Sequence, residues 1–148
     1  MTLEIVPAHA PLELEHFLPY RLSILSNTVS QSIADEYQDR FQLSMTEWRV
    51  MTILARFPAS SATQVVERTR MDKVAVSRAV ARLVEAGRID RGTYDGDKRR
   101  SVLNLSEAGW AIHDEVAPLA RAHERELLEK LSEDEKAWLE KILDKLLG

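Results

Sequence analysis

A run of consecutive basic residues is the first feature of the sequence with recognisable chemistry. Lys98, Arg99 and Arg100 follow Asp97 and the turn-forming pair at 95–96. Guanidinium groups bind phosphate, and the negative potential of a narrow DNA minor groove favours arginine. Asp97 is spaced to hold the Arg99 guanidinium in a bidentate pair. The run therefore predicts contact with a nucleic acid, and a hairpin charged only for solubility is the alternative.

A second set of polar residues predicts a helix that fits the DNA major groove. Asp72 is a suitable N-cap, and the helical pattern runs from Lys73 to Ala86 before Gly87. The inward stripe consists of Val76, Val80, Leu83 and Gly87. The residues on other sides that suit contact with bases and phosphates are Lys73, Ser77, Arg78 and Arg82. A merely solvated basic face is the alternative.

The distribution of charge supports a nucleic acid partner although the 148-residue chain has a net charge of −4. Residues 60–105 contain ten Lys and Arg against six Asp and Glu, a balance of +4. The other residues contain ten bases and eighteen acids, a balance of −8. Such asymmetry indicates a basic working face on an acidic support.

Several start and stop signals predict the elements that position these residues. A first helix extends from Leu18 to about Tyr37, and a short helix before the basic one ends near Thr69. Patterns with Ser at the N-cap and Glu or Gln three residues later open three helices, at 44–47, 61–64 and 132–135.

Two strands and a long helix complete the expected order. The strands are predicted at 89–93 and 101–105, around a turn that contains 95–96. Ser106 caps the helix that follows. We expect Pro118 to kink or interrupt this helix before it resumes towards Leu131. Two short helices followed by a hairpin are the parts of a helix-turn-helix with a wing.

Other classes of protein find little support in the sequence. Cysteine is absent, no apolar run reaches 18 residues, and the first residues lack a secretory pattern, so one cytoplasmic domain is expected. The four histidines have no metal-ligand spacing, no nucleophile or phosphate-loop motif is present, and no cofactor is predicted. An enzyme is therefore not expected.

Three segments in the right order give the chain a resemblance to the MarR (multiple antibiotic resistance regulator) family. They are LSMTEWRVMTIL, SATQVVERTRMDKVAVSRAVARLVEAGRIDR and DGDKRRSVLNLSEAG. The resemblance implies a mainly α (α+β) winged helix-turn-helix fold. It also implies one domain, 1–148, with a DNA-binding lobe at 44–106 and dimerisation helices at 12–40 and 107–148.

The resemblance also implies roles for particular residues. Ser77 and Arg78 occupy the recognition-helix pair, and Asp97 and Arg99 the wing pair, with Arg99 in the minor groove. Hydroxyls at Ser61 and Thr63 begin the preceding helix, where phosphate is bound. The full set of predicted DNA-binding residues is Ser61, Thr63, Lys73, Ser77, Arg78, Arg82, Asp97, Lys98, Arg99 and Arg100. Arg88 and Arg100 depart from the family pattern; both add positive charge, and they put the local packing of the wing in doubt.

The predicted function is that of a homodimeric, sequence-specific regulator of transcription that binds a palindromic operator in double-stranded DNA. Apolar residues at 12–18 and 138–146 are predicted to form the dimer interface. The family implies a repressor released by a small aromatic or phenolic ligand. The residues that suit the ligand cleft are Trp48, Met51, Trp110 and His113, and an ordinary core is the alternative for each of them. The alternatives are an activator, a ligand-independent regulator, and a protein-interaction module that does not bind DNA.

Overall fold

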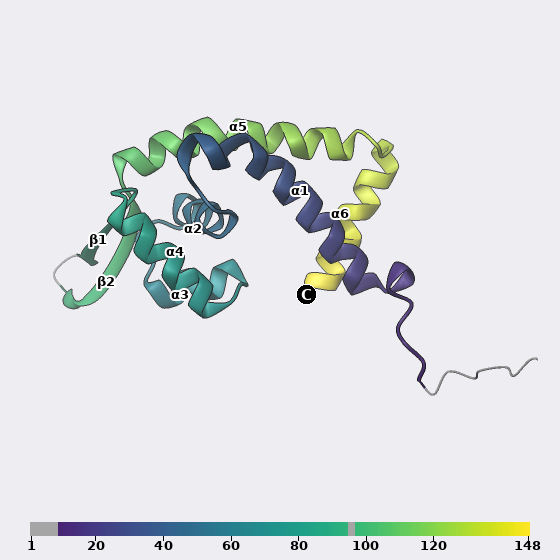
Figure 1. The fold of residues 1–148 in the computed structure, drawn as a ribbon, viewed down its shortest axis with the longest axis horizontal. Coiled ribbons are helices and arrows are strands. Elements are labelled where there is room, and N and C mark those ends of the chain that lie inside the picture. Colours follow the sequence, from purple (N-terminus) through teal and green to yellow (C-terminus); the bar gives the residue numbers. More distant parts are fainter. Residues whose placement is uncertain (1–8, 95–96) are drawn as a thin grey trace, which may run out of the picture.

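Helices form most of the chain, and a two-stranded sheet projects from one end (Figure 1). The structure is a computed structural model that describes residues 9–94 and 97–148, with the backbone alone described at 93, 94 and 97–100. The helical elements are η1 (Leu14–His16), α1 (Leu18–Phe41), α2 (Met45–Arg56), α3 (Ala62–Thr69), α4 (Lys73–Glu85), α5 (Glu107–Leu128) and α6 (Glu133–Leu147). The strands are β1 (Ile89–Tyr94) and β2 (Asp97–Leu105).

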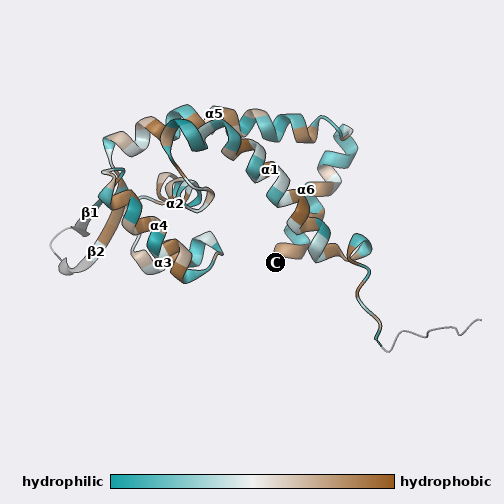
Figure 2. Cartoon of the chain, in the orientation of Figure 1, coloured by the Kyte–Doolittle hydropathy of each residue, from teal (hydrophilic) through white to brown (hydrophobic). Residues whose placement is uncertain are grey.

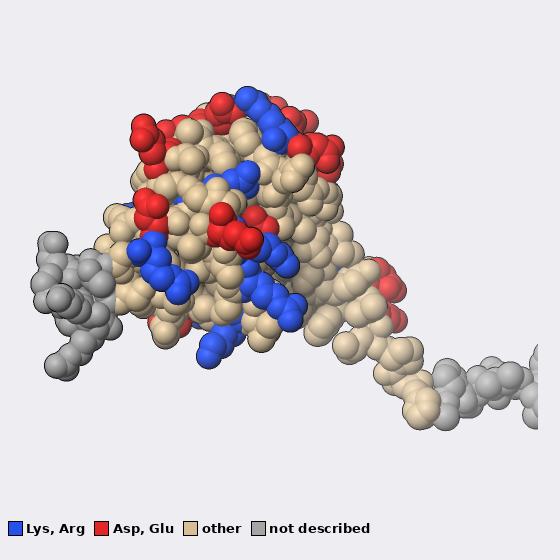
Figure 3. All heavy atoms as spheres, turned by 60° about the vertical axis from the view of Figure 1, so that its left-hand side comes forward, with Lys and Arg blue, Asp and Glu red and all other residues tan. Residues whose placement is uncertain are grey.

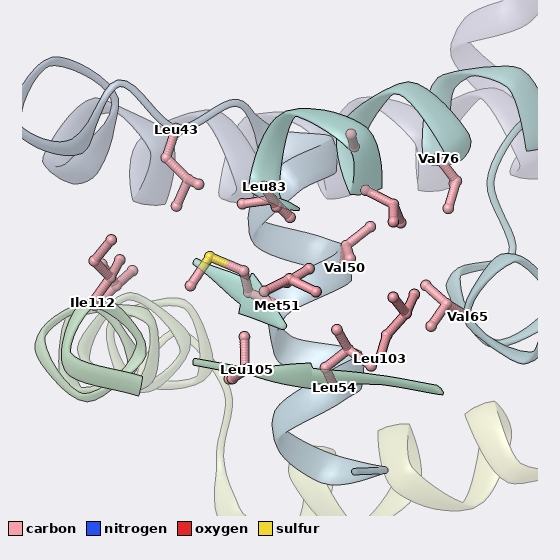
Figure 4. Close-up of a cluster of buried hydrophobic side chains, with 14 of the residues drawn as sticks. Leu43, Val50, Met51, Leu54, Val65, Val76, Leu83, Leu103, Leu105 and Ile112 are labelled. Atoms are coloured by element: carbon pink, nitrogen blue, oxygen red, sulfur yellow. The ribbon is translucent and has the colours of Figure 1, made fainter. Parts of the chain in front are cut away.

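A single core fixes the lobe formed by α2, α3, α4 and the sheet. Leu54, Val65 and Leu83 come from three different helices, and each is at most 1% exposed. Their side chains point toward one another and toward Leu103 of β2 (Figure 4). Burial of such side chains stabilises the fold by about 1.5–3 kcal/mol each. Ile112 of α5 joins the same cluster, so the long helix is anchored to the lobe.

The antiparallel sheet carries the hairpin away from this core. Ile89 pairs with Leu105, Arg91 with Leu103, and Thr93 with Ser101. Leu103 also forms a bridge with Ser60 in the loop between α2 and α3, where the Leu103 N–H donates to the Ser60 carbonyl at 2.8 Å. The base of the hairpin is therefore held against the lobe.

The end of α4 and the start of α5 form one close-packed junction. Gly87 has φ +74°, a conformation that a glycine adopts at little cost after a helix end. Its carbonyl accepts a 2.6 Å hydrogen bond from the Ser106 hydroxyl, which caps α5. Gly109 lies so near Arg88 that a Cβ there would stand 2.2 Å from the Arg88 carbonyl oxygen. The orientation of α4 is thus tied to α5.

The molecule has the shape of an arch: the lobe forms one side, α5 spans the top, and α1 and α6 form the other side (Figure 1). Of the two outcomes predicted for Pro118, interruption of the helix is wrong, because α5 continues through it; a kink stays a prediction. Pro118 is exposed, so water can solvate the carbonyl that loses its N–H partner. Within the described residues, no helix combines the length and apolar character that a membrane crossing requires.

Most predicted boundaries are confirmed within a few residues. The capping boxes at Ser61 and Ser132 have both reciprocal hydrogen bonds. At Ser44 only one half of the box forms: the hydroxyl accepts from the Glu47 N–H and donates to the Glu47 carboxylate. Gly87 is exposed, so it acts as a turn residue and not as part of the inward stripe of α4.

Candidate nucleic-acid interface

The helix α4 has one buried side and one exposed polar side. Its buried residues are Val76, Ala79, Val80 and Leu83. Its predicted DNA-binding residues, all exposed, are Lys73, Ser77, Arg78 and Arg82. Asp72 caps the helix, its carboxylate accepting from the Ala75 N–H at 2.9 Å. All four predicted residues of α4 are thus exposed to solvent, around the part of the helix that faces away from the core.

The preceding helix α3 is held at its N-terminus by the cap that the sequence predicts. The Ser61 hydroxyl accepts from the Gln64 N–H at 3.1 Å, and the Gln64 side chain accepts from the Ser61 N–H at 2.9 Å. Thr63, in the first turn, is exposed. Both hydroxyl residues therefore lie at the end of α3 whose N–H groups favour an anion.

In the space-filling view, most of the charged side chains on the lower half, which contains α3 and α4, are basic. The upper edge over α5 is mostly acidic, with a basic side chain among the acids (Figure 3). Arg68 of α3 lies over the Phe57 ring, with its guanidinium carbon 4.3 Å from the ring centroid. Its Nη1 donates to the Ser60 hydroxyl at 2.7 Å. The uneven distribution of charge along the sequence thus gives an uneven distribution of charge on the surface.

Arg82 differs from the other basic residues of α4 because an acid lies behind it. Its Nη1 is 3.9 Å from Oε1 of Glu47, a carboxylate on α2 that is only 10% exposed. This contact keeps Arg82 at the flank of α4, and the sequence spacing does not reveal it.

The same carboxylate also acts on Tyr37 of α1. Burial of the phenol and the charge of Glu47 together raise the pKa of Tyr37 to about 12.

The wing is present as the hairpin of β1 and β2. The predicted residues Asp97, Lys98, Arg99 and Arg100 have side chains outside the described part of the structure. The predicted pair between Asp97 and Arg99 therefore stays a prediction. Arg91, near the base of the hairpin, is exposed.

Arg88 has a role that sequence reasoning missed. Its Nη2 donates to the carbonyl of Phe41, the last residue of α1, at 2.5 Å, and the side chain is half-buried. A cation at the C-terminal end of a helix interacts favourably with the helix dipole. Arg88 therefore joins the beginning of the wing to α1 and does not extend the basic surface.

A hollow of about 430 Å³ separates the middle of α1 from the lobe, a size that suits a small organic ligand. Two cations line it, Arg49 on α2 and Arg70 in the turn between α3 and α4. The other lining residues are Ser26, Asn27, Ser30, Ile33, Tyr37, Met45, Trp48, Thr69 and Met71.

One of the four predicted ligand residues, Trp48, lines this hollow. Met51 does not; it is completely buried in the core, which is the alternative that the sequence analysis left open. His113 stacks on Trp48 with ring centroids 5.8 Å apart, and Trp110 packs edge-on against His113 at 5.3 Å. These two residues of α5 lie behind Trp48 and are not among the residues that line the hollow.

The regions predicted to form a dimer interface carry exposed apolar side chains. Among the described residues, α6 contains none that is buried. Figure 2 shows hydrophobic segments on α6 and on the adjoining part of α1. The large apolar residues exposed there are Leu12, Leu14, Phe17, Leu18, Tyr20, Leu22, Ile24, Leu25, Trp138, Leu139, Ile142, Leu143, Leu146 and Leu147.

The histidines do not form a histidine-rich metal centre in the part of the chain that the structure describes. Glu13, Glu15 and His16 do place ligand atoms within 4.8 Å of one another, a grouping that the spacing analysis overlooked. All three are exposed, and nothing else at this point indicates an ion. His123 instead lies 3.5 Å from Glu36 of α1.

Comparison with known proteins agrees with this geometry. The sequence model of the MarR family matches residues 41–100. The HTH-type transcriptional regulator PecS of Dickeya dadantii is 27% identical over 128 residues, 84% of this chain and 76% of that protein.

Two solved structures extend the comparison to the whole fold. A MarR/EmrR family transcriptional regulator from Acinetobacter sp. ADP1 has a TM-score of 0.81 at 30% identity, covering 91% of this chain and 95% of its own. A mutant of Escherichia coli MarR in complex with operator DNA has a TM-score of 0.75 at 25% identity, covering 94% of this chain and all of its own.

Proposed function

The chain belongs to the MarR family of transcriptional regulators, and we propose that it acts as a homodimeric repressor that binds a palindromic operator in double-stranded DNA. The observation that carries this proposal is the exposed polar and basic side of α4, whose opposite side is anchored in the core. The major groove of B-DNA admits one α-helix, so α4 can dock there as a rigid unit.

Each element of the lobe has a distinct contact in this arrangement. Ser77 and Arg78 reach base edges, while Lys73 and Arg82 bind phosphate beside the groove. Ser61 and Thr63 bind phosphate at the start of α3. From the sequence alone, Asp97 orients Arg99 for the minor groove, with Lys98 and Arg100 at the adjacent backbone.

Two copies of the chain are needed because one lobe contacts only one half-site. We assign residues 44–106 to DNA binding and residues 12–40 and 107–148 to dimerisation. The exposed apolar residues of α1 and α6 support this division, since a patch of this kind on a soluble chain marks an interaction surface. A two-fold axis between the copies matches a palindrome with half-sites about 34 Å apart.

Ligand control fits the hollow between α1 and the lobe. Arg49 and Arg70 offer positive charge to an acid, and Trp48 offers an aromatic surface. A small aromatic acid bound there would change the orientation of the lobe relative to α1. This would change the distance between the two α4 helices of the dimer. Loss of the half-site spacing then releases the operator.

The other readings suit the molecule less well. A protein-interaction module would present an apolar surface on α4, but four of its exposed residues are Lys73, Ser77, Arg78 and Arg82. The relatives are regulators of transcription, and we expect no enzymatic activity. Because the proposed partner is operator DNA, we expect the protein to act in the cytoplasm.

Selection from a random pool of duplexes by the purified protein tests the proposal. We expect one palindromic sequence to be enriched. The logarithm of the binding constant should fall linearly with the logarithm of salt concentration, because each neutralised phosphate releases counterions. Failure to enrich any duplex at low ionic strength would contradict the proposal. Benzoate and hydroxybenzoates added to the selected complex test the release step.

A further inference from the structure

One apolar side chain interrupts the polar side of α4. Val74 is 56% exposed, although valine is a residue type that proteins usually bury. A single exposed valine needs no explanation by itself. The position of Val74 on the helix does need an explanation, because Val74 lies among the residues that face the proposed DNA.

The direction of Val74 follows from helix geometry. With a rotation of 100° per residue, Val74 points about 170° away from the centre of the four buried residues of α4. Arg78 and Ala81 point about 150° away, whereas Ser77 and Arg82 point about 110° away. Val74 and Arg78 are therefore directed at the floor of a groove, and Arg82 at its side.

The contacts around the helix agree with this direction. Glu47 lies 3.9 Å from the Arg82 guanidinium and keeps that side chain near α2. Arg78 is exposed and points away from the core, so its side chain can reach the bases. Val74 and Arg78 are four residues apart, so their side chains are neighbours on the helix surface.

The floor of the major groove offers matching chemistry to both side chains. Its one apolar group is the C5 methyl of thymine, and guanine presents two acceptors, O6 and N7, that suit a guanidinium. α4 contains no Asn or Gln, the residues that read adenine in the bidentate manner. Beside the hydroxyl of Ser77, which can bond to more than one base, discrimination by this helix thus depends on one methyl and one arginine contact.

We propose that Val74 reads a thymine methyl group in each operator half-site and that Arg78 reads a guanine within about two base pairs of it, since four helical residues rise about 6 Å. The inference rests on the proposed function, because it specifies what α4 recognises once the operator is bound.

Replacement of single thymines by uracil tests the first contact, because uracil lacks only the methyl group. In the selected operator, one thymine per half-site should lose about fourfold in affinity on replacement, the loss expected for about 0.8 kcal/mol of apolar burial. The readout is fluorescence anisotropy with the full chain.

Variants decide whether Val74 makes this contact. Val74→Ala should weaken binding to the thymine operator by about 16-fold, because both copies of the chain lose the contact, and it should show no further loss with uracil. Val84→Ala is the matched control, since Val84 is a half-buried valine of the same helix that packs against the core. It should keep the full uracil effect.

A parallel substitution tests Arg78. Replacement of one guanine per half-site by 7-deazaguanine removes the N7 acceptor and should weaken binding by the wild-type chain. The same replacement should have no effect on Arg78→Ala.

The outcomes separate the inference from the function on which it rests. Operator binding that is unaffected by uracil at every thymine would overturn the role of Val74 and leave the repressor proposal intact. An undiminished uracil effect in Val74→Ala would overturn it as well. Failure of the wild-type chain to select any operator would overturn both the inference and the proposed function.

Discussion

The lobe and the α1–α6 side of the arch use the same apolar residue types in opposite ways. In the lobe, Leu54 and Leu83 are at most 1% exposed. On α6, Ile142 is 48% exposed and Leu146 is 64% exposed. The lobe therefore completes its own core, whereas the helices beside it carry apolar surface that one copy of the chain leaves in water.

This difference corresponds to two conditions for DNA binding: each α4 must be held in the right setting within its own chain, and two α4 helices must be held at the right distance. The shape of α4 and its setting against α2 and α3 depend on contacts within one chain. The distance between two α4 helices depends on a second chain. Apolar area that leaves water contributes about 25 cal/mol per Å², so covering the exposed residues of α1 and α6 favours association.

The largest effect should come from charge placed on the apolar surface of α6. Ile142→Asp should prevent dimerisation and lower operator affinity on the order of 100-fold or more, because two linked contacts become one. Light scattering and anisotropy measure the two changes together. The control is Glu140→Ala, an exposed position on the same helix, which should remain dimeric. If the Ile142→Asp protein is still a dimer, the exposed apolar surface of α6 is not the dimer interface, and the difference drawn between the two regions is wrong.

The next largest effect should come from the core of the lobe. Leu83→Ala should lower the free energy of unfolding by about 2–5 kcal/mol, because a fully buried leucine leaves a cavity. Val74→Ala shortens an aliphatic side chain of the same helix, outside the proposed dimer interface, where the side chain is 56% exposed. It should cost less than about 0.5 kcal/mol. Urea denaturation measures both, and equal losses would refute the difference in packing.

A smaller effect is expected at Arg88, which connects the two regions. Arg88→Met should lower the free energy of unfolding by about 1.5–3 kcal/mol, the range for a hydrogen bond with a charged partner. Arg91→Met, an exposed change in the same hairpin, should have little effect. If the two variants unfold at the same urea concentration, Arg88 does not hold the end of α1.

The smallest effect, absent at neutral pH, concerns Tyr37. Its pKa is raised to about 12 from the ordinary value of 10. Folding therefore favours the protonated phenol, and this stabilisation is complete below pH 10 and is lost as the pH rises from 10 to 12. The stability of Tyr37→Phe should fall less steeply over this interval than that of the wild type. Parallel curves for the two proteins would contradict the raised pKa.

The local part of the fold was predictable because its signals lie within a few residues. The boxes at Ser61 and Ser132, the cap at Asp72 and the glycine at 87 each act on adjacent backbone groups. Pro118 was misjudged because the cost of a proline in a helix depends on whether the freed carbonyl meets water.

The candidate site was predictable only where it lies on one helix. The exposed side of α4 follows from its periodicity. Arg88 against Phe41, and Glu47 against Arg82, join residues far apart in the sequence, so no spacing rule finds them. Met51 was assigned to the ligand cleft because a methionine suits both a pocket and a core, and burial decides between them.

The mass of the complex between the wild-type chain and its selected operator tests the central claim most directly. Light scattering on a duplex that contains one palindrome should give two chains per duplex, and a duplex with one half-site deleted should bind far more weakly. One chain per duplex, with equal affinity for the intact and the half-deleted site, would contradict the account of two α4 helices on one operator.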